Sequence, residues 1–314
     1  MKKILITGGA GFIGSHLCDF FLKKGFFVVA LDNLITGQLS NITHNSKIKN
    51  FKFFELDITT KIELDYEFDF ILNFASPASP KDFDRIPFKI IESIAFGTKN
   101  ILDFALKHNS KLLIASTSEV YGNPITNPQS ENYNGNVSTT SPRSVYDESK
   151  RFAETLASTY AREYNLDVKI ARIFNTYGPR MRRDDGRVIP NFINQIIEGK
   201  NLTVYGDGNQ TRSFCYVDDL VVGLYKLLIS DSKEPVNLGN PVENSINNLA
   251  NLCYKLFDSK KNIIYKELPI DDPVKRRPNI DLAINKLNWE PKINLKDGLI
   301  KTYNYFIKDY NNNS

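Results

Sequence analysis

Tyr146 and Lys150 are the two residues whose types and spacing point most directly to chemistry. They stand four positions apart within a helical pattern, so both side chains project from one face of the expected helix. Val145, Phe152 and Leu156 supply the apolar face that packs this helix. A tyrosine beside an ammonium group can act as a general base toward a hydroxyl group, although this spacing also arises by chance.

The stretch ASTSEVYG, residues 115–122, ends an apolar run in hydroxyl and carboxylate side chains. A buried carboxylate such as Glu119 is costly unless a partner or a ligand neutralises it. Thr117 stands at the carboxyl end of an expected strand, where open α/β sheets bind their ligands. We expect Thr117 to hold a substrate hydroxyl whose proton Tyr146 removes. Half-ionisation of a tyrosine at pH 7 requires lowering its pKa by about 3 units, or roughly 4 kcal/mol.

The segment GGAGFIG places Gly8, Gly11 and Gly14 between an expected strand and an expected helix. Glycines at such a turn let a pyrophosphate approach the backbone, although tight turns also use glycine for steric reasons alone. Asp32 ends the next expected strand, close to the position of the acidic residue that grips an adenosine ribose, roughly 20 residues on. A carboxylate there repels a 2′-phosphate, so we predict NAD rather than NADP as the cofactor.

Asp57 follows the third expected strand and allows two interpretations, a contact to the adenine amino group or a helix N-cap. The residues predicted to bind NAD come from the glycine loop, from the ends of the next strands and from the Tyr–Lys pair. They are Gly8, Gly11, Phe12, Ile13, Gly14, Asp32, Asn33, Asp57, Ile58, Ala75, Tyr146 and Lys150.

Apolar runs and helical patterns alternate through the first half of the chain. Strands are expected in KKILITG, FFVVALD, FKFFELD, FDFILNFA, KLLIAST and DVKIARIFN, and helices over about 11–24, 90–108 and 141–165. This alternation predicts an α/β fold, a doubly wound parallel Rossmann sheet with helices on both faces. After Asn175, turn-rich segments and shorter helices predict a smaller C-terminal lobe. We expect 1–175 to form the first domain, with about 213–238 returning to it, and 176–212 and 239–314 to form the second.

Composition narrows the class of partner. The chain has 314 residues and a net charge of +4, with 40 basic and 36 acidic residues. Its scattered basic residues argue against nucleic acid and favour a small anionic ligand. The three cysteines and three histidines show no metal-ligand spacing, so no metal site is expected. The first residues read as a strand, and no apolar run reaches the roughly 20 residues of a membrane span, so we expect a soluble cytoplasmic protein.

Taken together, GGAGFIG, Asp32, STSEVYG, YDESK and RIFNTYGPR resemble the extended short-chain dehydrogenase/reductase family of nucleotide-sugar enzymes. The likeness covers essentially the whole chain. Within that family, NFASPASP, PRSVYDESKR, ARIFNTYGPRMRRDDGRV, LTVYGDGNQTRSF and DDPVKRRP are similar to segments of the UDP-glucuronate decarboxylases, which make UDP-xylose. One position departs from the family, since Ile94 stands where its members usually have Asn.

The resemblance implies oxidation of UDP-glucuronate at C4, loss of the C6 carboxylate as carbon dioxide, and return of the hydride to C4. It implies that Glu119 and Arg276 handle the carboxylate and the proton that follows. The implied catalytic residues are Thr117, Glu119, Tyr146, Lys150 and Arg276. Two alternatives stay open: Glu119 as a structural carboxylate that accepts backbone amides, and Arg276 as part of a solvated basic loop.

The second lobe is then expected to bind the nucleotide sugar. Arginines pair well with phosphate oxygens, and Tyr205 could stack on uracil. The predicted substrate-binding residues are Ser79, Ser118, Asn175, Arg180, Arg182, Arg187, Tyr205, Gln210, Arg212 and Arg276. Each of them could also be an ordinary surface residue.

Two other functions also fit this sequence. A nucleotide-sugar 4-epimerase or 4,6-dehydratase shares the first oxidation, but the dehydratases carry Asp where this chain has Ser118. A non-catalytic NAD-binding regulator would not need the intact Thr117, Tyr146 and Lys150. The resemblance also implies a homodimer, formed by the long helices around 90–108 and 145–164.

Overall fold

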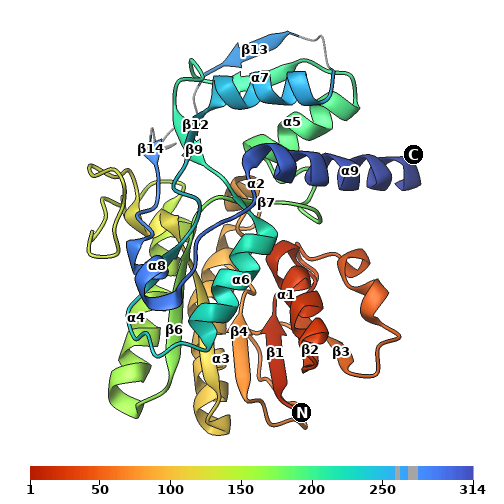
Figure 1. The fold of residues 1–314 in the computed structure, drawn as a ribbon. Helices are drawn as coiled ribbons and strands as arrows, with labels where there is room; N and C mark the ends of the chain where they lie inside the picture. Colours follow the sequence, from red (N-terminus) through yellow and green to blue (C-terminus); the bar gives the residue numbers. More distant parts are fainter. Residues whose placement is uncertain (259–261, 268–274, 314) are drawn as a thin grey trace.

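A seven-stranded parallel sheet forms the centre of the molecule and confirms the predicted doubly wound fold (Figure 1). The computed structural model describes residues 1–258, 262–267 and 275–313. The strand order is β11-β6-β5-β4-β1-β2-β3. The bounds of these strands are β1 Lys3–Thr7, β2 Phe27–Asp32, β3 Phe51–Glu55, β4 Phe70–Asn73, β5 Lys111–Thr117, β6 Val168–Ile173 and β11 Val236–Leu238.

Helices cover both faces of this sheet because successive strand residues face opposite sides. Ile4 and Ile6 of β1 belong to a core shared with helices α1 and α6, whereas Leu5 belongs to a core shared with α3 and α4. The bounds of these helices are α1 Phe12–Lys23, α3 Pro87–His108, α4 Ser144–Tyr164 and α6 Val217–Leu228. Helix α3 begins three residues before its expected start, since Pro87 suits the first turn of a helix.

The elements after β6 build three small sheets, β10-β7, β12-β9-β14 and β13-β8. In Figure 1, α5, α7, α9 and β13 lie together beyond one end of the central sheet. The strands are β7 Thr176–Tyr177, β8 Leu202–Tyr205, β9 Thr211–Ser213, β10 Cys215–Tyr216, β12 Glu243–Ser245, β13 Ile263–Lys266 and β14 Lys275–Arg276. The helices are α5 Val188–Ile197, α7 Ile246–Leu256, α8 Asp281–Leu287 and α9 Leu295–Asn313.

The sequence pattern does not predict the shortest helices and strands. Strand β11 and the small sheets have two to four residues per strand, too few to show a period. Helix α2 (Pro80–Arg85) and the 3₁₀ helices η1 (Leu39–Asn41), η2 (Thr43–Asn45) and η3 (Ser118–Tyr121) were missed for the same reason. Within the described ranges, no helix combines the length and the apolar character that a membrane span requires.

Candidate functional site

A cavity of about 580 Å³ opens beyond the carboxyl ends of the central strands. Both halves of the chain line it, from the glycine loop after β1 to Arg276 of β14. Every residue of the predicted catalytic, cofactor-binding and substrate-binding sets is among the lining residues. The fold therefore brings these residues together, and their individual roles stay predictions.

The glycine loop shapes one end of the cavity. Gly8 has a φ of +66°, and a Cβ there would lie 2.5 Å from the carbonyl oxygen of Phe74. A Cβ on Gly14 would overlap the carbonyl oxygen of Gly8, so only glycine fits this crossing of loop and helix. Helix α1 starts after Gly11 without a side-chain cap. Its first N–H groups are thus available to an anion, which is the feature that a pyrophosphate needs.

Asp32 lies at the end of β2, where the ribose contact is predicted. It is buried, and its carboxylate accepts hydrogen bonds from the N–H groups of Ala10 (3.0 Å) and Leu34 (2.9 Å). Burial raises the pKa of this carboxyl group. A Cβ on Gly37 would lie 2.6 Å from Asp32 Oδ1, so the absence of a side chain there keeps the carboxylate accessible from the cavity. The residues at this end fit a dinucleotide.

Asp57 serves a local turn as well as lining the cavity. Its carboxylate accepts from the N–H of Thr59 (2.9 Å) and from the amide group of Asn33 (3.0 Å). These bonds lower the pKa of Asp57 even though partial burial acts in the opposite direction. No helix begins between Asp57 and β4, a stretch that the structure describes in full, so the helix N-cap interpretation is wrong and the carboxylate stabilises a turn instead. The contact to adenine stays a prediction.

Gly14→Ala is expected to weaken NAD binding roughly tenfold or more, because the added methyl group must displace the loop that the pyrophosphate approaches. The same overlap should lower the melting temperature. Titration with NAD and a thermal unfolding scan measure the two effects. Gly199→Ala is the control, since a Cβ on Gly199 would meet open space and only its positive φ, of +64°, disfavours alanine there. It should lose about 1 kcal/mol of stability and keep its NAD affinity; normal NAD binding by Gly14→Ala would contradict the expectation.

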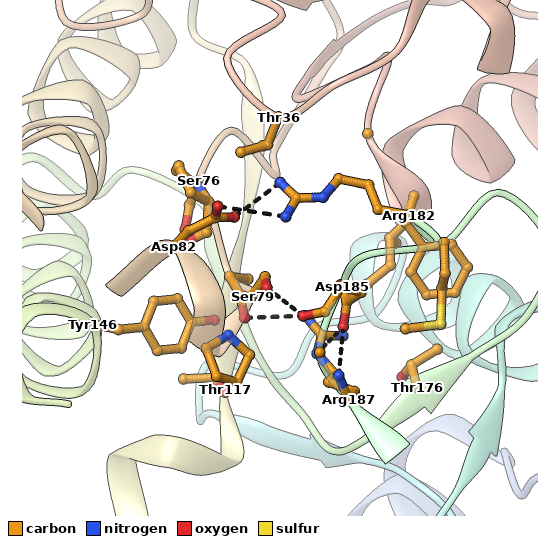
Figure 2. A pocket seen from close by; sticks show the side chains of 18 of the residues that line it. Thr36, Ser76, Ser79, Asp82, Thr117, Tyr146, Thr176, Arg182, Asp185 and Arg187 are labelled. Atoms are coloured by element: carbon orange, nitrogen blue, oxygen red, sulfur yellow. Dashed lines mark hydrogen bonds and ion pairs between the residues drawn. The ribbon is translucent and has the colours of Figure 1, made fainter. Parts of the chain in front are cut away.

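Thr117, Tyr146 and Lys150 meet where β5 ends against α4. Figure 2 shows Tyr146 and Thr117 next to each other at the edge of the cavity. The Thr117 side chain acts to lower the pKa of Tyr146, against the larger effect of burial. The Lys150 ammonium donates to the carbonyl of Ala115 (2.8 Å) and lies 5.6 Å from the centre of the Tyr146 ring. The predicted trio is therefore in place around one point.

Burial disfavours the charged forms of both Tyr146 and Lys150. It raises the pKa of Tyr146 to about 12 and lowers the pKa of Lys150 to about 8. The protein alone therefore shifts Tyr146 away from the value that a general base needs at neutral pH. A positive charge brought into the cavity beside the ring would shift the pKa back down.

Glu119, which follows strand β5, lies between two guanidinium groups. They neutralise the carboxylate, which would otherwise be costly to bury. One carboxylate oxygen accepts from Arg143 (2.6 Å) and the other from Arg276. The two arginines lower the pKa of Glu119 to about 2 against the opposing effect of burial. Arg276 also donates to the carbonyl of Gly122 (2.8 Å) and is only 3% exposed. The alternative of Arg276 in a solvated loop is thus wrong; residues 271–274, just before it, lie outside the described residues.

Arg143 lines the cavity and the Asp147 carboxylate lies beside it, 3.9 Å from Arg143 Nε, although neither residue is among the predicted site residues. Arg143 precedes Tyr146 by three residues and Asp147 follows Arg143 by four, so all three share one side of the start of α4. The Arg143 guanidinium lies 5.6 Å from the ring centre of Phe83, which stacks on Tyr146. The motif PRSVYDESK contains this spacing, which alone could have indicated that Arg143 and Asp147 lie beside Tyr146.

Apolar packing supports Tyr146 from the other side. Ile94 belongs to a small buried cluster with Phe83, Ile90, Tyr146 and Ala153. The position at which the family resemblance has Asn is thus apolar here, and it packs in the same cluster as the proposed base.

Three of the arginines predicted to hold phosphates already have carboxylate partners. Arg180 pairs with Asp19 (2.7 Å), Arg182 with Asp82 (3.0 Å) and Arg187 with Asp185 (3.1 Å). Figure 2 shows the last two pairs across the cavity from Tyr146. Phosphate oxygens entering here must share these arginines with the carboxylates.

The other predicted substrate residues are placed as follows. Ser79 donates to the carbonyl of Asp185, Gln210 to that of Tyr205 (2.5 Å), and Arg212 to that of Thr211 (2.9 Å). Ser118 is buried in η3, and Asn175 lies between β6 and β7. Each lines the cavity, and their contacts to substrate stay predictions.

Comparison with known proteins gives close matches over nearly the full chain. The chain is 47% identical over 308 residues to UDP-glucuronic acid decarboxylase 1 of Xenopus tropicalis, covering 98% of this chain and 73% of that protein. It is 46% identical over 310 residues to UDP-glucuronic acid decarboxylase 1 of Arabidopsis thaliana, covering 99% and 70%. Among solved structures, UDP-glucuronic acid 4-epimerase from Bacillus cereus, in complex with UDP-glucuronic acid and NAD, superposes with a TM-score of 0.88 at 29% identity, covering 98% of this chain and 99% of the other.

The chain also matches the sequence model of a protein family, in agreement with the fold, the glycine loop and the Thr–Tyr–Lys trio. Residues 4–239 match the model of the NAD dependent epimerase/dehydratase family. This range runs from the second residue of β1 to just past β11, so all seven strands of the central sheet fall within it except Lys3. The match and the identities above confirm the resemblance found in the motifs: the chain belongs to the NAD dependent epimerase/dehydratase family.

Proposed function

We propose that this protein is an NAD-dependent UDP-glucuronate decarboxylase that forms UDP-xylose. The observation that carries the proposal is Glu119, held between Arg143 and Arg276 in the cavity that also contains Thr117, Tyr146 and Lys150. Guanidinium groups bind carboxylates well, and here they lie beside Thr117, Tyr146 and Lys150, as the oxidation of a uronate substrate requires. Relatives 46–47% identical to this chain are named UDP-glucuronic acid decarboxylases.

The chain's own residues would divide the work as follows. Bound NAD supplies the hydride acceptor and later returns the same hydride. Thr117 orients the C4 hydroxyl group, and Tyr146 accepts its proton and gives it back at the end. Lys150, held by the Ala115 carbonyl, keeps a positive charge near the Tyr146 ring. Arg276 and Arg143 hold the carboxylate, which leaves as carbon dioxide once C4 is a ketone. Glu119 assists protonation of C5.

The alternative activities differ in what they require beside Thr117. Loss of water across C5 and C6 needs an acid for the leaving oxygen, and Ser118 is a poor acid. A 4-epimerase needs only that its 4-keto intermediate rotate within the site before the hydride returns. The matched structure of a UDP-glucuronic acid 4-epimerase makes this second activity the one to test against.

A substrate screen tests the proposal. Purified protein is incubated with NAD and, separately, with UDP-glucuronate, UDP-glucose and dTDP-glucose, while carbon dioxide and sugar products are followed. Only UDP-glucuronate should react, with UDP-xylose and carbon dioxide formed in equal amounts. Conversion of UDP-glucuronate to UDP-galacturonate without gas release would replace decarboxylation with epimerisation.

The proposed substrate contacts extend the same assignment. Tyr205 at the end of β8 would stack on uracil, and Arg180, Arg182, Arg187 and Arg212 would face the diphosphate. The division into an NAD-binding part, 1–175 with about 213–238, and a sugar-nucleotide part is supported by β11, which pairs with β6. A cytoplasmic location stays a prediction.

We also propose a homodimer formed through α3 and α4, which pack against each other. Phe88 (75% exposed) and Phe96 (61%) of α3 and Phe152 (49%) of α4 present aromatic rings to the outside. Burying such rings between two copies would contribute roughly 1.5–3 kcal/mol for each. Phe96→Asp is therefore expected to shift the protein from dimer to monomer in analytical ultracentrifugation. Ile125→Asp, at an 83% exposed position elsewhere, is the control that should stay dimeric; a monomeric unaltered protein would contradict the proposal.

A further inference from the structure

Four charged side chains near Thr117 and Tyr146 are linked to one another by ion pairs. Arg276 comes from β14, Glu119 from η3, and Arg143 and Asp147 from the start of α4. Glu119 takes one guanidinium group on each of its oxygens. Among the described residues this cluster therefore contains two guanidinium groups and two carboxyl groups. Of these four residues, the predicted catalytic set included only Glu119 and Arg276.

Asp147 is the member of the cluster with the weakest pairing. Its side chain is only 8% exposed, and Oδ2 lies 3.9 Å from Arg143 Nε. Oδ1 is buried and has no hydrogen-bond partner among the described residues. A buried carboxylate with one distant ion pair is poorly compensated, whereas a protonated carboxyl group carries no charge to compensate. The geometry thus makes Asp147 the group whose protonation responds to a new charge.

The groups that face Asp147 determine the sign of that response. Glu119 of η3 and Glu148 of α4 raise its pKa, Arg143 of α4 and Arg276 of β14 lower it, and burial, the largest effect, raises it. The result is a pKa raised to about 7. Tyr146, the adjacent residue, is protonated at neutral pH. An additional anion bound by the two arginines would oppose ionisation of Asp147 further.

The proposed reaction supplies that anion and also consumes a proton. The uronate carboxylate brings one negative charge beside Arg276 and Arg143. When the bond between C5 and C6 breaks, carbon dioxide leaves with no charge and the electron pair remains as an enolate. C5 then takes up one proton, so each turnover removes one proton from solution. With Asp147 protonated, the two guanidinium groups balance Glu119 and the substrate carboxylate.

We propose that Asp147 takes up a proton when the carboxylate of the substrate binds, and so brings into the site the proton that decarboxylation consumes. This inference rests on the proposed function. Loss of carbon dioxide moves the negative charge from the carboxylate beside the arginines to the enolate, and the proton of Asp147 can then pass to C5 through Glu119, the carboxylate of the cluster that lines the cavity. Asp147 acts through its charged neighbours and is therefore a positioning residue.

Calorimetric titration in buffers of different ionisation enthalpy counts the protons taken up on binding. The protein is loaded with NADH, which cannot accept a hydride, so that binding is observed without turnover. UDP-glucuronate at pH 7.5 should bind with uptake of about 0.5–1 proton, and its affinity should fall up to tenfold per pH unit above pH 8. UDP-xylose, which lacks the carboxylate, is the matched ligand and should bind with almost no uptake.

The variant Asp147→Asn keeps the shape of the side chain and removes its titration. It should bind UDP-glucuronate with no more proton uptake than UDP-xylose shows, and the affinities of the two ligands should then depend on pH in the same way between pH 7 and 8.5. Asp147→Glu should restore the uptake, which a purely structural role would not predict. Equal uptake with both ligands, or full uptake in Asp147→Asn, would overturn the inference.

Release of carbon dioxide by the unaltered protein distinguishes this outcome from failure of the proposed function. If carbon dioxide is formed but no uptake is seen on binding, only the role of Asp147 is lost. The comparison of the two ligands on the unaltered protein decides the question even if the Asp147 variants do not fold.

Discussion

Tyr146→Phe is expected to lower the rate of UDP-xylose formation by about 1,000-fold or more, with no transient absorbance of NADH. The hydroxyl group of Tyr146 lies next to Thr117 at the edge of the cavity (Figure 2), and no other side chain of the Thr117–Tyr146–Lys150 trio can take its place as the base. Without it, the proton of the C4 hydroxyl has no acceptor as the hydride leaves, and one positioned acid–base group is worth about 10²–10⁴-fold. Rapid-mixing absorbance at 340 nm and a carbon dioxide assay measure the two steps.

Binding should survive this substitution. Phenylalanine keeps the ring that stacks on Phe83 and packs in the cluster of Ile90 and Ile94, so the fold and the affinity for substrate should change little. Tyr164→Phe, at the exposed end of the same helix, is the control and should keep full activity. Normal turnover by Tyr146→Phe would remove this residue from its role as the base.

Glu119→Ala is expected to slow carbon dioxide release by about 100-fold or more, while oxidation at C4 still takes place. The substitution leaves Thr117, Tyr146 and Lys150 intact, so NADH should form and persist longer than in the unaltered protein. It also removes the carboxylate that occupies Arg276 and Arg143. The KM for UDP-glucuronate should therefore stay the same or fall, because the substrate carboxylate no longer competes with Glu119 for the two arginines.

Two companion variants sharpen this result. Glu119→Gln keeps the volume and one acceptor but loses the charge and the titration, so it should resemble Glu119→Ala in rate. Glu163→Ala, an exposed residue near the end of α4, should have no effect. An unchanged rate in Glu119→Ala would make Glu119 a structural counter-ion of the arginines only.

The parts of the site that lie close together in sequence could be predicted, and those assembled by the fold could not. Gly8 to Gly14 sit in one turn, and Tyr146 and Lys150 in one helical turn, so spacing alone placed them. Arg143 reaches Glu119 across 24 residues, and Arg182 reaches Asp82 across 100. Neither pairing leaves a local pattern, because it depends on how α4 meets η3 and how the loop before α5 meets α2.

Arg276 shows what a family resemblance adds to spacing. It contacts Glu119 across 157 residues, and its position follows from two-residue strand β14 pairing with β9. No periodicity marks a strand that short. The resemblance singled out Arg276, whereas its burial and its bond to the Gly122 carbonyl could come only from the structure.

Following the hydrogens of the sugar tests the central claim most directly, namely that C4 is oxidised and then regains its own hydride. UDP-glucuronate carrying deuterium at C4 is converted in ordinary water, and unlabelled UDP-glucuronate is converted in deuterium oxide, with both products examined by NMR. The account predicts UDP-xylose that keeps deuterium at C4 in the first case and gains one solvent deuterium at C5 in the second. Solvent hydrogen at C4, or a product with no solvent hydrogen at C5, would contradict it.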